Sequence, residues 1–166
     1  MITIRKLQIN DAENFLNLLN KTDSETTFLL YEKGERKTTI EEQQKNIQEG
    51  IKKGVLTFVL EDNKKLVGYV WGNIFTGNRK KHCMYLAVAV LQEYTGKGYG
   101  TKLMKTLEKH AINNGITRLE LEVSKNNKVA ISLYQKIGFE AEGVKRNAFL
   151  VNGKYEDELL MAKIIK

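Results

Sequence analysis

The sequence predicts an α/β domain (α+β in its strand arrangement) with one central, mixed, mostly antiparallel sheet of about seven strands and helices on both faces. Strand-like alternation and helical periodicity are interspersed along the chain in the order β-α-α-β-β-β-α-β-α-β-β. Residues 83–91 (CMYLAVAVL) are almost entirely apolar, as in a central strand covered on both faces. The 166 residues are most simply one domain, 1–166.

The first elements follow from alternation and capping signals. Residues 3–8 alternate as a strand, and Asn10 or Asp11 can cap a helix that continues to Asn20. Residues 21–37 have no clean period, so we expect mostly loop. They belong to a stretch, 21–50, with seven acidic and five basic residues, an acidic bias within a basic chain.

The second helix has the clearest start signal in the sequence. Thr39 with Glu42 three residues later forms a capping-box pattern, which predicts a helix to about Lys52 that Gly54 ends. Strands are expected at 55–60 and 66–75, where Gly68 and Gly72 mark a bulge or a close backbone approach.

The central part of the chain combines a strand, a glycine loop and a helix. The apolar strand 83–91 is followed by TGKGYG at 95–100, and a helix with an apolar stripe spans 99–114 before Gly115. Cys83 is expected to be a small core residue. The basic cluster at 79–81 is expected to lie in a solvated turn.

The last third is expected to add a strand, a helix and a hairpin. Residues 118–123 (RLELEV) alternate as a half-buried strand, and a helix starts at Asn126 or Asn127 and stops at Gly138. Strands at about 139–147 and 155–165 are joined by a turn at Asn152-Gly153.

Composition and charge exclude several classes of protein. No apolar segment approaches the length needed to cross a bilayer, and a lone cysteine fits a cytoplasmic protein without disulfides. The net charge of +7 is spread along the chain without a long basic tract, so we expect an anionic small molecule rather than nucleic acid. His82 and His110 lack partners at metal-ligand spacing, so no metal site is expected.

The glycine loop predicts an anion site, because the first amides of a helix lack intrahelical acceptors and attract phosphate. The order Gly100-Thr101-Lys102 does not match a P-loop. A dinucleotide fold stays open on the strength of Glu120 and Glu122 about 20 residues later. It is disfavoured because the third glycine comes one residue early and the strands look antiparallel.

A second segment, Asn127-x-x-Ala130-x-x-Leu133-Tyr134-x-x-x-Gly138-Phe139, follows the glycine loop. Together the two closely resemble the GNAT superfamily of acetyl-CoA-dependent N-acetyltransferases, and the tail resembles the phosphinothricin and amino-acid acetyltransferase branch. Thr95 departs from the pattern, since the family usually has Gln or Arg there. We therefore expect no role for its side chain.

The resemblance implies that acetyl-CoA is the co-substrate and that the backbone of one loop holds its pyrophosphate. The pantetheine arm is expected to pair with the backbone near Val88 and Val90, with a Val90 amide facing the thioester oxygen. The cofactor-binding residues implied are Val88, Val90, Thr95, Gly96, Lys97, Gly98, Tyr99, Gly100, Thr101, Asn127 and Tyr134.

The resemblance makes Tyr134 the general acid for the thiolate and suggests Glu122 as the base, acting through water. Tyr134 could instead be plain core, Asn127 could simply cap its helix, and Glu122 could be solvent-facing. The acceptor is expected to be a small-molecule amine or amino acid. A protein N-terminus, a non-catalytic acyl-CoA-binding module and a homodimer through the C-terminal strands remain open.

Overall fold

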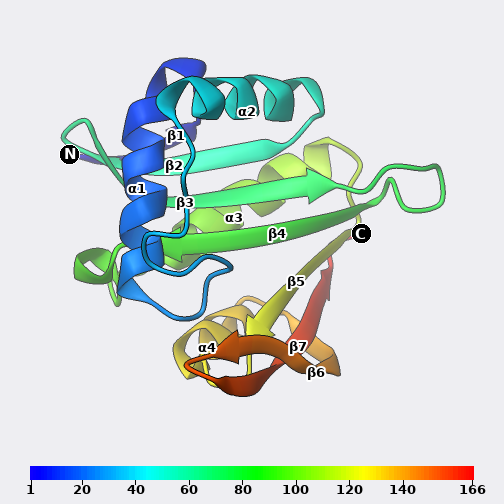
Figure 1. The fold of residues 1–166 in the computed structure, drawn as a ribbon. Coiled ribbons are helices and arrows are strands. Elements are labelled where there is room, and N and C mark those ends of the chain that lie inside the picture. The colour runs from blue at the N-terminus through cyan, green and yellow to red at the C-terminus, as the bar shows by residue number, and fades with distance from the viewer.

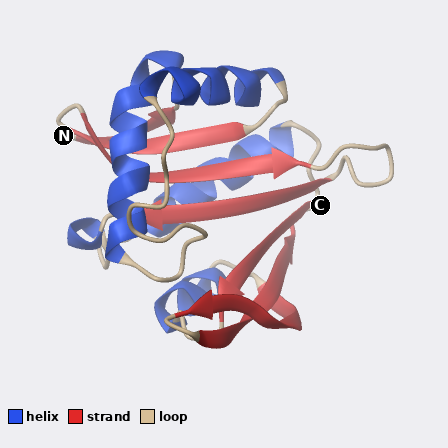
Figure 2. Cartoon of the chain, in the orientation of Figure 1, coloured by secondary structure: helices blue, strands red, loops and turns tan.

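The computed structural model describes all residues from Met1 to Lys166, and one seven-stranded sheet forms its centre (Figures 1 and 2). In spatial order the strands are β1 (Ile2–Lys6), β2 (Leu56–Asp62), β3 (Lys65–Ile74), β4 (Cys83–Val90), β5 (Arg118–Ser124), β7 (Lys154–Ile164) and β6 (Glu140–Val151). Every neighbouring pair is antiparallel except β4 and β5, which are parallel. The predicted mixed, mostly antiparallel sheet is confirmed.

Helices cover both faces of this sheet, as predicted. They are α1 (Ala12–Glu25), α2 (Ile40–Lys52), α3 (Tyr99–Asn113) and α4 (Lys128–Lys136), with short 3-10 turns η1 (Ile9–Asp11) and η2 (Gln92–Tyr94). Figure 1 shows α1 and α2 in front of the sheet and α3 and α4 behind it. None of these helices has the length and apolar character needed to span a bilayer.

The core includes β4, the middle strand of the sheet. Met84 and Leu86 are buried there, and Leu107 of α3 is fully buried against the same sheet. A Cβ at Gly72 of β3 would overlap the sulfur of Met84, so this glycine permits a close approach. A bulge between Leu60 and Glu61 lies opposite the neighbourhood of Gly68, as the glycine pattern suggested.

Most helix ends lie where the sequence predicts them. The Thr39 hydroxyl accepts from the Glu42 amide at 3.2 Å, and the Glu42 carboxylate accepts from the Thr39 amide at 2.8 Å, so both halves of the capping box form. Gly54 and Gly115 end α2 and α3 with φ of +80° and +76°. These left-handed residues let the chain turn sharply into the next strand.

Most strand ends differ from the sequence expectation by no more than two residues, but two boundaries differ by four or more. Helix α1 continues to Glu25, five residues beyond Asn20, because Thr22 and Asp23 are buried and Asp23 has an ion-pair partner in the following loop. Strand β6 continues to Val151, because the left-handed Asn147 forms an irregularity inside the strand and does not end it. A polar tertiary contact accompanies each difference, since the Asn147 amide donates to the Asp157 carboxylate of β7 at 2.9 Å.

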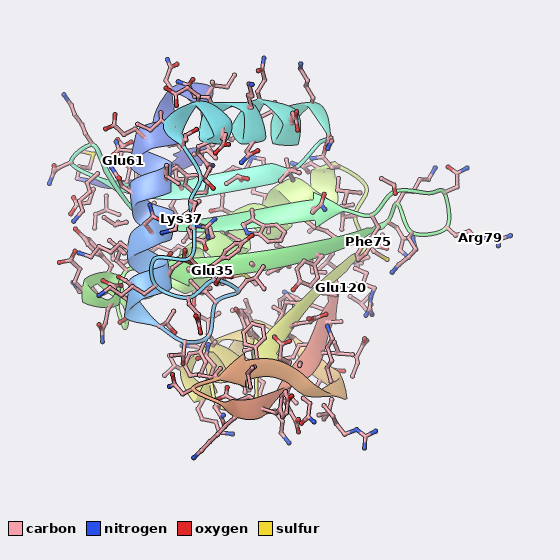
Figure 3. The ribbon with its side chains drawn as sticks, viewed as in Figure 1. Glu35, Lys37, Glu61, Phe75, Arg79 and Glu120 are labelled. Carbon is pink, nitrogen blue, oxygen red and sulfur yellow. The ribbon has the colours of Figure 1, made fainter.

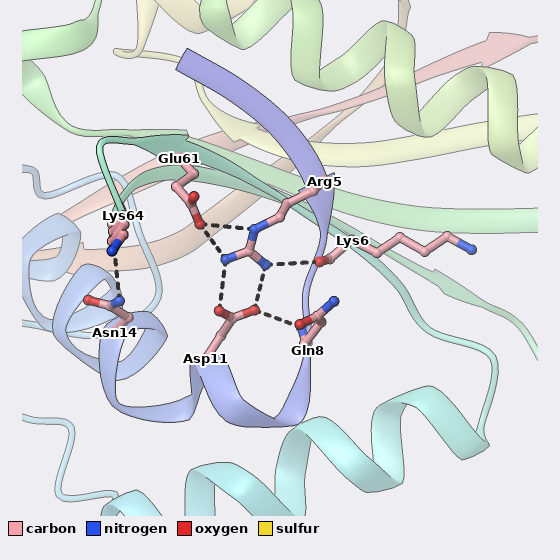
Figure 4. A network of polar contacts seen from close by, with 7 residues as sticks. All are labelled: Arg5, Lys6, Gln8, Asp11, Asn14, Glu61 and Lys64. Carbon is pink, nitrogen blue, oxygen red and sulfur yellow. Dashed lines mark hydrogen bonds and ion pairs between the residues drawn. The ribbon is translucent and has the colours of Figure 1, made fainter. Parts of the chain in front are cut away.

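Arg5 of β1 ties the N-terminal elements together (Figure 4). Its guanidinium donates two 2.8 Å hydrogen bonds to the Asp11 carboxylate at the end of η1. It also binds the Glu61 carboxylate on β2. The Asp11 carboxylate accepts from the Gln8 amide as well, so this residue closes η1 instead of capping α1.

The basic cluster at 79–81 lies in the exposed loop between β3 and β4, as predicted. Figure 3 shows Arg79 at the tip of this loop, far from the sheet, and Phe75 at its base. The Lys80 ammonium lies 4.0 Å from the centre of the Phe75 ring. The cluster is therefore a solvated turn, remote from the cleft described next.

Candidate functional site

A cleft of about 950 Å³ opens where β4 and β5 diverge. The two strands pair only from Cys83 with Arg118 to Tyr85 with Glu120, although β4 continues to Val90 and β5 to Ser124. Figure 1 shows the strands separating below α1. The divergence leaves one edge of β4 without a neighbouring strand.

The backbone of β4 presents alternate residues to this open edge. Leu91 N–H donates to Val67 O at 2.9 Å and Phe75 N–H donates to Cys83 O at 3.1 Å, so the odd-numbered residues of β4 bond to β3. The N–H and C=O groups of Val88 and Val90 therefore point the other way, into the gap. The structure places both predicted residues on the cleft with unpaired backbone groups.

The glycine loop supplies a second row of free backbone donors. The amides of residues 96–101 donate no hydrogen bond within the chain, and the first bond of α3 runs from Lys102 N–H to Gly98 O at 3.1 Å. Gly96 and Gly98 have φ of +73° and +80°, a conformation that other residues adopt only with strain. Gly96, Gly98, Tyr99, Gly100 and Thr101 line the cleft.

The side chains of Thr95 and Lys97 are engaged elsewhere. The Thr95 hydroxyl donates to Gln92 O at 2.7 Å and closes η2. The Lys97 ammonium donates to Glu93 O at 2.9 Å and lies over the Tyr94 ring, and Lys97 is the one predicted site residue that does not line the cleft. Thr95 borders the cleft with its hydroxyl already bonded, in accord with the expectation that its side chain has no role.

A second hollow adjoins the cleft along α3 and the end of α4. Its border includes four lysines, and Thr101 and Lys136 border both spaces. One of the lysines, Lys163, is bound to Glu108 at 2.8 Å. The positive character of this hollow suits an anionic ligand that extends out of the cleft past the start of α3.

Tyr134 lies in the wall of the cleft and is 7% exposed. Its ring packs 5.9 Å from that of Phe139, centre to centre, and its hydroxyl has no hydrogen-bond partner in the chain although no buried polar side-chain atom is left unsatisfied. Its oxygen therefore borders the open cleft. Burial raises the pKa of Tyr134, so the phenol keeps its proton throughout the neutral range.

Asn127 caps α4, as one of the two sequence interpretations required. Its side-chain oxygen accepts from the Ala130 amide at 3.2 Å. The residue also lines the cleft, and its side-chain amide nitrogen has no partner in the chain, so it remains a free donor at the start of the helix that carries Tyr134.

Glu122 lies on the cleft side of β5, but it has a cationic partner. The Lys145 ammonium of β6 donates to its carboxylate at 3.1 Å. Glu120, two residues earlier, is bound to Arg118 at 2.8 Å and does not line the cleft. Of the two alternating glutamates, only Glu122 reaches the site.

The sequence did not single out the aromatic and acidic residues opposite Tyr134. Trp71 of β3 and Tyr85 of β4 line the cleft with their rings 5.8 Å apart, and burial, together with the nearby Glu122, raises the pKa of Tyr85 to about 12. Glu158 of β7 also lines the cleft and is 7% exposed. Three acids lie side by side in the sequence at 156–158, so only the strand pairing distinguishes Glu158.

The loop between α1 and α2 covers the remaining side of the cleft. Phe28, Leu29 and Leu30 contribute apolar lining. Arg36 binds the buried Asp23 at 2.9 Å and its guanidinium lies 4.5 Å from the centre of the Tyr31 ring, which anchors the loop to α1. Arg36 is thus committed to holding the loop in place.

The chain belongs to the acetyltransferase (GNAT) family, whose model matches residues 15–139. This match covers the diverging strands, the glycine loop and the helix that carries Tyr134. The predicted membership is confirmed.

Two relatives match parts of the sequence. The L-amino acid N-acetyltransferase AaaT of Escherichia coli K12 is 30% identical over 100 residues, which are 60% of this chain and 62% of that protein. The N-acetyltransferase YobR of Bacillus subtilis is 48% identical over 52 residues, 31% of this chain and 21% of YobR. The chain therefore spans less than two thirds of the length of these relatives.

Solved structures share the whole architecture. An acetyltransferase of the GNAT family from Streptococcus pneumoniae superposes with a TM-score of 0.94 at 28% identity, over 99% of this chain and 100% of that one. The structure of yncA from Salmonella typhimurium with its cofactor acetyl-CoA gives 0.88 at 19% identity, over 100% and 95% of the two chains. At that identity the second likeness establishes the fold alone.

Proposed function

We propose that this protein transfers an acetyl group from acetyl-CoA to a primary amine of a small molecule. The observation that carries the proposal is the unpaired edge of β4 in the same cleft as six consecutive free amides. The strand edge suits the amide-bearing pantetheine arm, and the loop at residues 96–101 suits the pyrophosphate. The lysine-bordered hollow beyond Thr101 complements the remaining phosphate charge of the co-substrate.

The chemistry needs a donor for the oxyanion, a proton for the leaving thiolate and a deprotonated amine. The amide of Val90 is assigned to the oxyanion, because its N–H points into the gap. Tyr134 is the proton donor, since burial keeps its phenol protonated and its oxygen borders the cleft. The side-chain amide of Asn127 is a donor to the pantetheine arm.

A carboxylate near the acceptor amine must assist loss of the amine proton. Glu122 is the residue that the family resemblance suggests, and its carboxylate is shared with Lys145. Glu158 is a second carboxylate on the same cleft. A small acceptor is favoured because residues of the loop between α1 and α2 line the same cleft as these carboxylates.

The test has a binding arm and a turnover arm. Acetyl-CoA at about 100 times its dissociation constant should stabilise the fold by about 2.7 kcal/mol, seen as a higher melting temperature. Release of free CoA, followed with a thiol reagent, should require an added primary amine. A protein that shows neither a melting shift with acetyl-CoA nor amine-dependent thiol release would contradict the proposed function.

A further inference from the structure

Glu158 is a mostly buried residue whose carboxylate has no partner in the chain. It lies in the middle of β7, where it is 7% exposed, and it faces the cleft. Its carboxylate forms no hydrogen bond or ion pair in the chain, whereas the other cleft-lining acids, Asp23, Glu25 and Glu122, all have a partner.

The neighbours of Glu158 do not neutralise it. It is opposite Ser124 of β5 and Lys145 of β6 in the sheet, but the Lys145 ammonium binds Glu122 instead. The Ser124 hydroxyl donates to Glu156, two residues earlier on β7, at 3.2 Å. Tyr85 of β4 also lies near Glu158, and Tyr134 of α4 lines the same cleft. Burial raises the pKa of Glu158, the negative Glu122 raises it further, and Lys145 opposes both.

Because no buried side-chain polar atom lacks a partner, the unpartnered Glu158 oxygens must reach the open cleft. A carboxylate that has lost most of its contact with water and has no cationic partner favours a cationic ligand at that place. A ligand that carried a carboxylate of its own would find no free cation in the cleft. Arg36 is committed to Asp23, and Lys136 lies toward the basic hollow at the opposite end. The part of the cleft around Glu158 therefore attracts cations and repels carboxylates.

We propose that Glu158 binds the ammonium group of the acceptor and takes its proton, and that the acceptor is an aliphatic amine without a neighbouring carboxylate. This assignment rests on the proposed acetyl transfer and narrows it, because amino acids would place their carboxylate against Glu122 and Glu158. The aromatic rings of Trp71 and Tyr85 provide the apolar wall that an aliphatic chain would contact.

The proton and bond changes balance as follows. The acceptor enters as R–NH3+, and one proton passes from nitrogen to the Glu158 carboxylate. The nitrogen lone pair forms the C–N bond to the thioester carbon, the C–S bond breaks, and the leaving thiolate takes the Tyr134 proton. The acylated nitrogen returns its second proton to Tyr134, and Glu158 releases its proton to solvent, so an amide, CoA thiol and one proton result.

The experiment compares wild type with Glu158→Gln, with Glu158→Asp and with Glu140→Gln as control. Glu140 is an exposed glutamate on the neighbouring β6 that makes no side-chain bond and does not line the cleft. The acceptors are 1,4-diaminobutane and L-methionine, assayed from pH 5 to 9 with acetyl-CoA.

For 1,4-diaminobutane, Glu158→Gln should lower kcat/KM about 100-fold and remove the acid-side ionisation from its pH profile. Glu158→Asp should keep that ionisation, and Glu140→Gln should match wild type. L-Methionine should be the poorer acceptor by at least tenfold. An acid-side ionisation that persists in Glu158→Gln, or L-methionine as the better acceptor, would overturn the assignment while leaving acetyl transfer intact.

A readout independent of turnover comes from thermal melts without ligand. Glu158→Gln should raise the melting temperature at pH 8 and change it little at pH 4, because the costly ionised carboxylate is then absent from both proteins. A lower melting temperature at pH 8 would identify Glu158 as a structural residue and overturn the inference. Failure of wild type to bind acetyl-CoA would instead count against the proposed function.

Discussion

The Lys145 ammonium lies 3.1 Å from the Glu122 carboxylate, and this pairing leaves Glu158 without a cation on the adjacent strand. Because Lys145 lowers the pKa of Glu158, Lys145→Ala should raise that pKa. The acid limb of the kcat/KM profile should therefore move to higher pH. Lys154→Ala, which removes an exposed lysine from the start of β7, is the matched control and should leave the limb unchanged.

Glu122→Gln separates the two candidate bases. Lys145→Ala alone cannot do so, because it also releases Glu122 from its ion pair. If Glu122 were the base, Glu122→Gln would abolish the acid limb of the kcat/KM profile. On our assignment, the limb survives in Glu122→Gln and shifts to lower pH, because one negative charge beside Glu158 is gone. An acid limb that disappears in Glu122→Gln would transfer the role to that residue.

Removing the Tyr134 hydroxyl should affect the chemical step and spare binding. Tyr134→Phe keeps the ring and its contact with Phe139, so we expect an intact fold and unchanged acetyl-CoA affinity. The loss of the proton donor should lower kcat by about 100-fold. Steady-state kinetics together with acetyl-CoA titration measure the two effects, and equal kcat values for both proteins would show that Tyr134 only packs.

The conformation of Gly98 should be needed for co-substrate binding. Its φ of +80° costs a residue with a Cβ about 1–2 kcal/mol, and relaxation of that strain would turn the free amides of residues 96–101 away from the cleft. Gly98→Ala should therefore weaken acetyl-CoA binding about tenfold or more, measured by calorimetry.

Gly54→Ala is a close control for this change. Gly54 also has a φ of +80° with no atom within 4 Å of an added Cβ, but it ends α2 away from the cleft. It should lose similar stability and keep its acetyl-CoA affinity. Equal loss of affinity in both variants would mean that general destabilisation, and not the loop geometry, weakens binding.

The parts of the fold that could be predicted are those that local sequence signals determine. The Thr39 and Glu42 cap, the left-handed glycines and the apolar strand 83–91 each act within a few residues, and all lie as expected. The end of α1 was missed because Asp23 is kept in the helix by Arg36, thirteen residues later. No periodicity records a contact of that kind.

The site residues also divide into those that a local motif reveals and those that only the tertiary structure brings together. The glycine loop and Tyr134 could be found because their motifs are contiguous, whereas Glu158 gains its surroundings only when β7 pairs with both β5 and β6. The acidic stretch at residues 21–50 does not supply the unpaired charge of the cleft. Its two cleft-lining acids are already occupied, Asp23 by Arg36 and Glu25 by the Gln92 amide. The unpaired charge comes from the C-terminal strands instead.

Asp11 should make the stability of the protein depend on pH in the acidic range. Its hydrogen bonds with Arg5 hold the pKa of its carboxyl below the usual 3.8, so folding favours the ionised form. This contribution is fully present above the unfolded pKa and is lost as pH falls through the lower folded pKa. Asp11→Asn should therefore destabilise the fold by about 1–2 kcal/mol at pH 7, as expected for charged hydrogen bonds. Denaturant melts at pH 7 and pH 3 measure this loss of stability, which should be smaller at pH 3.

Glu13→Gln is the control for this prediction. It is an exposed change two residues later on α1 and should show no such pH dependence. A deficit of equal size at both pH values would mean that shape, rather than charge, makes Asp11 important at this junction.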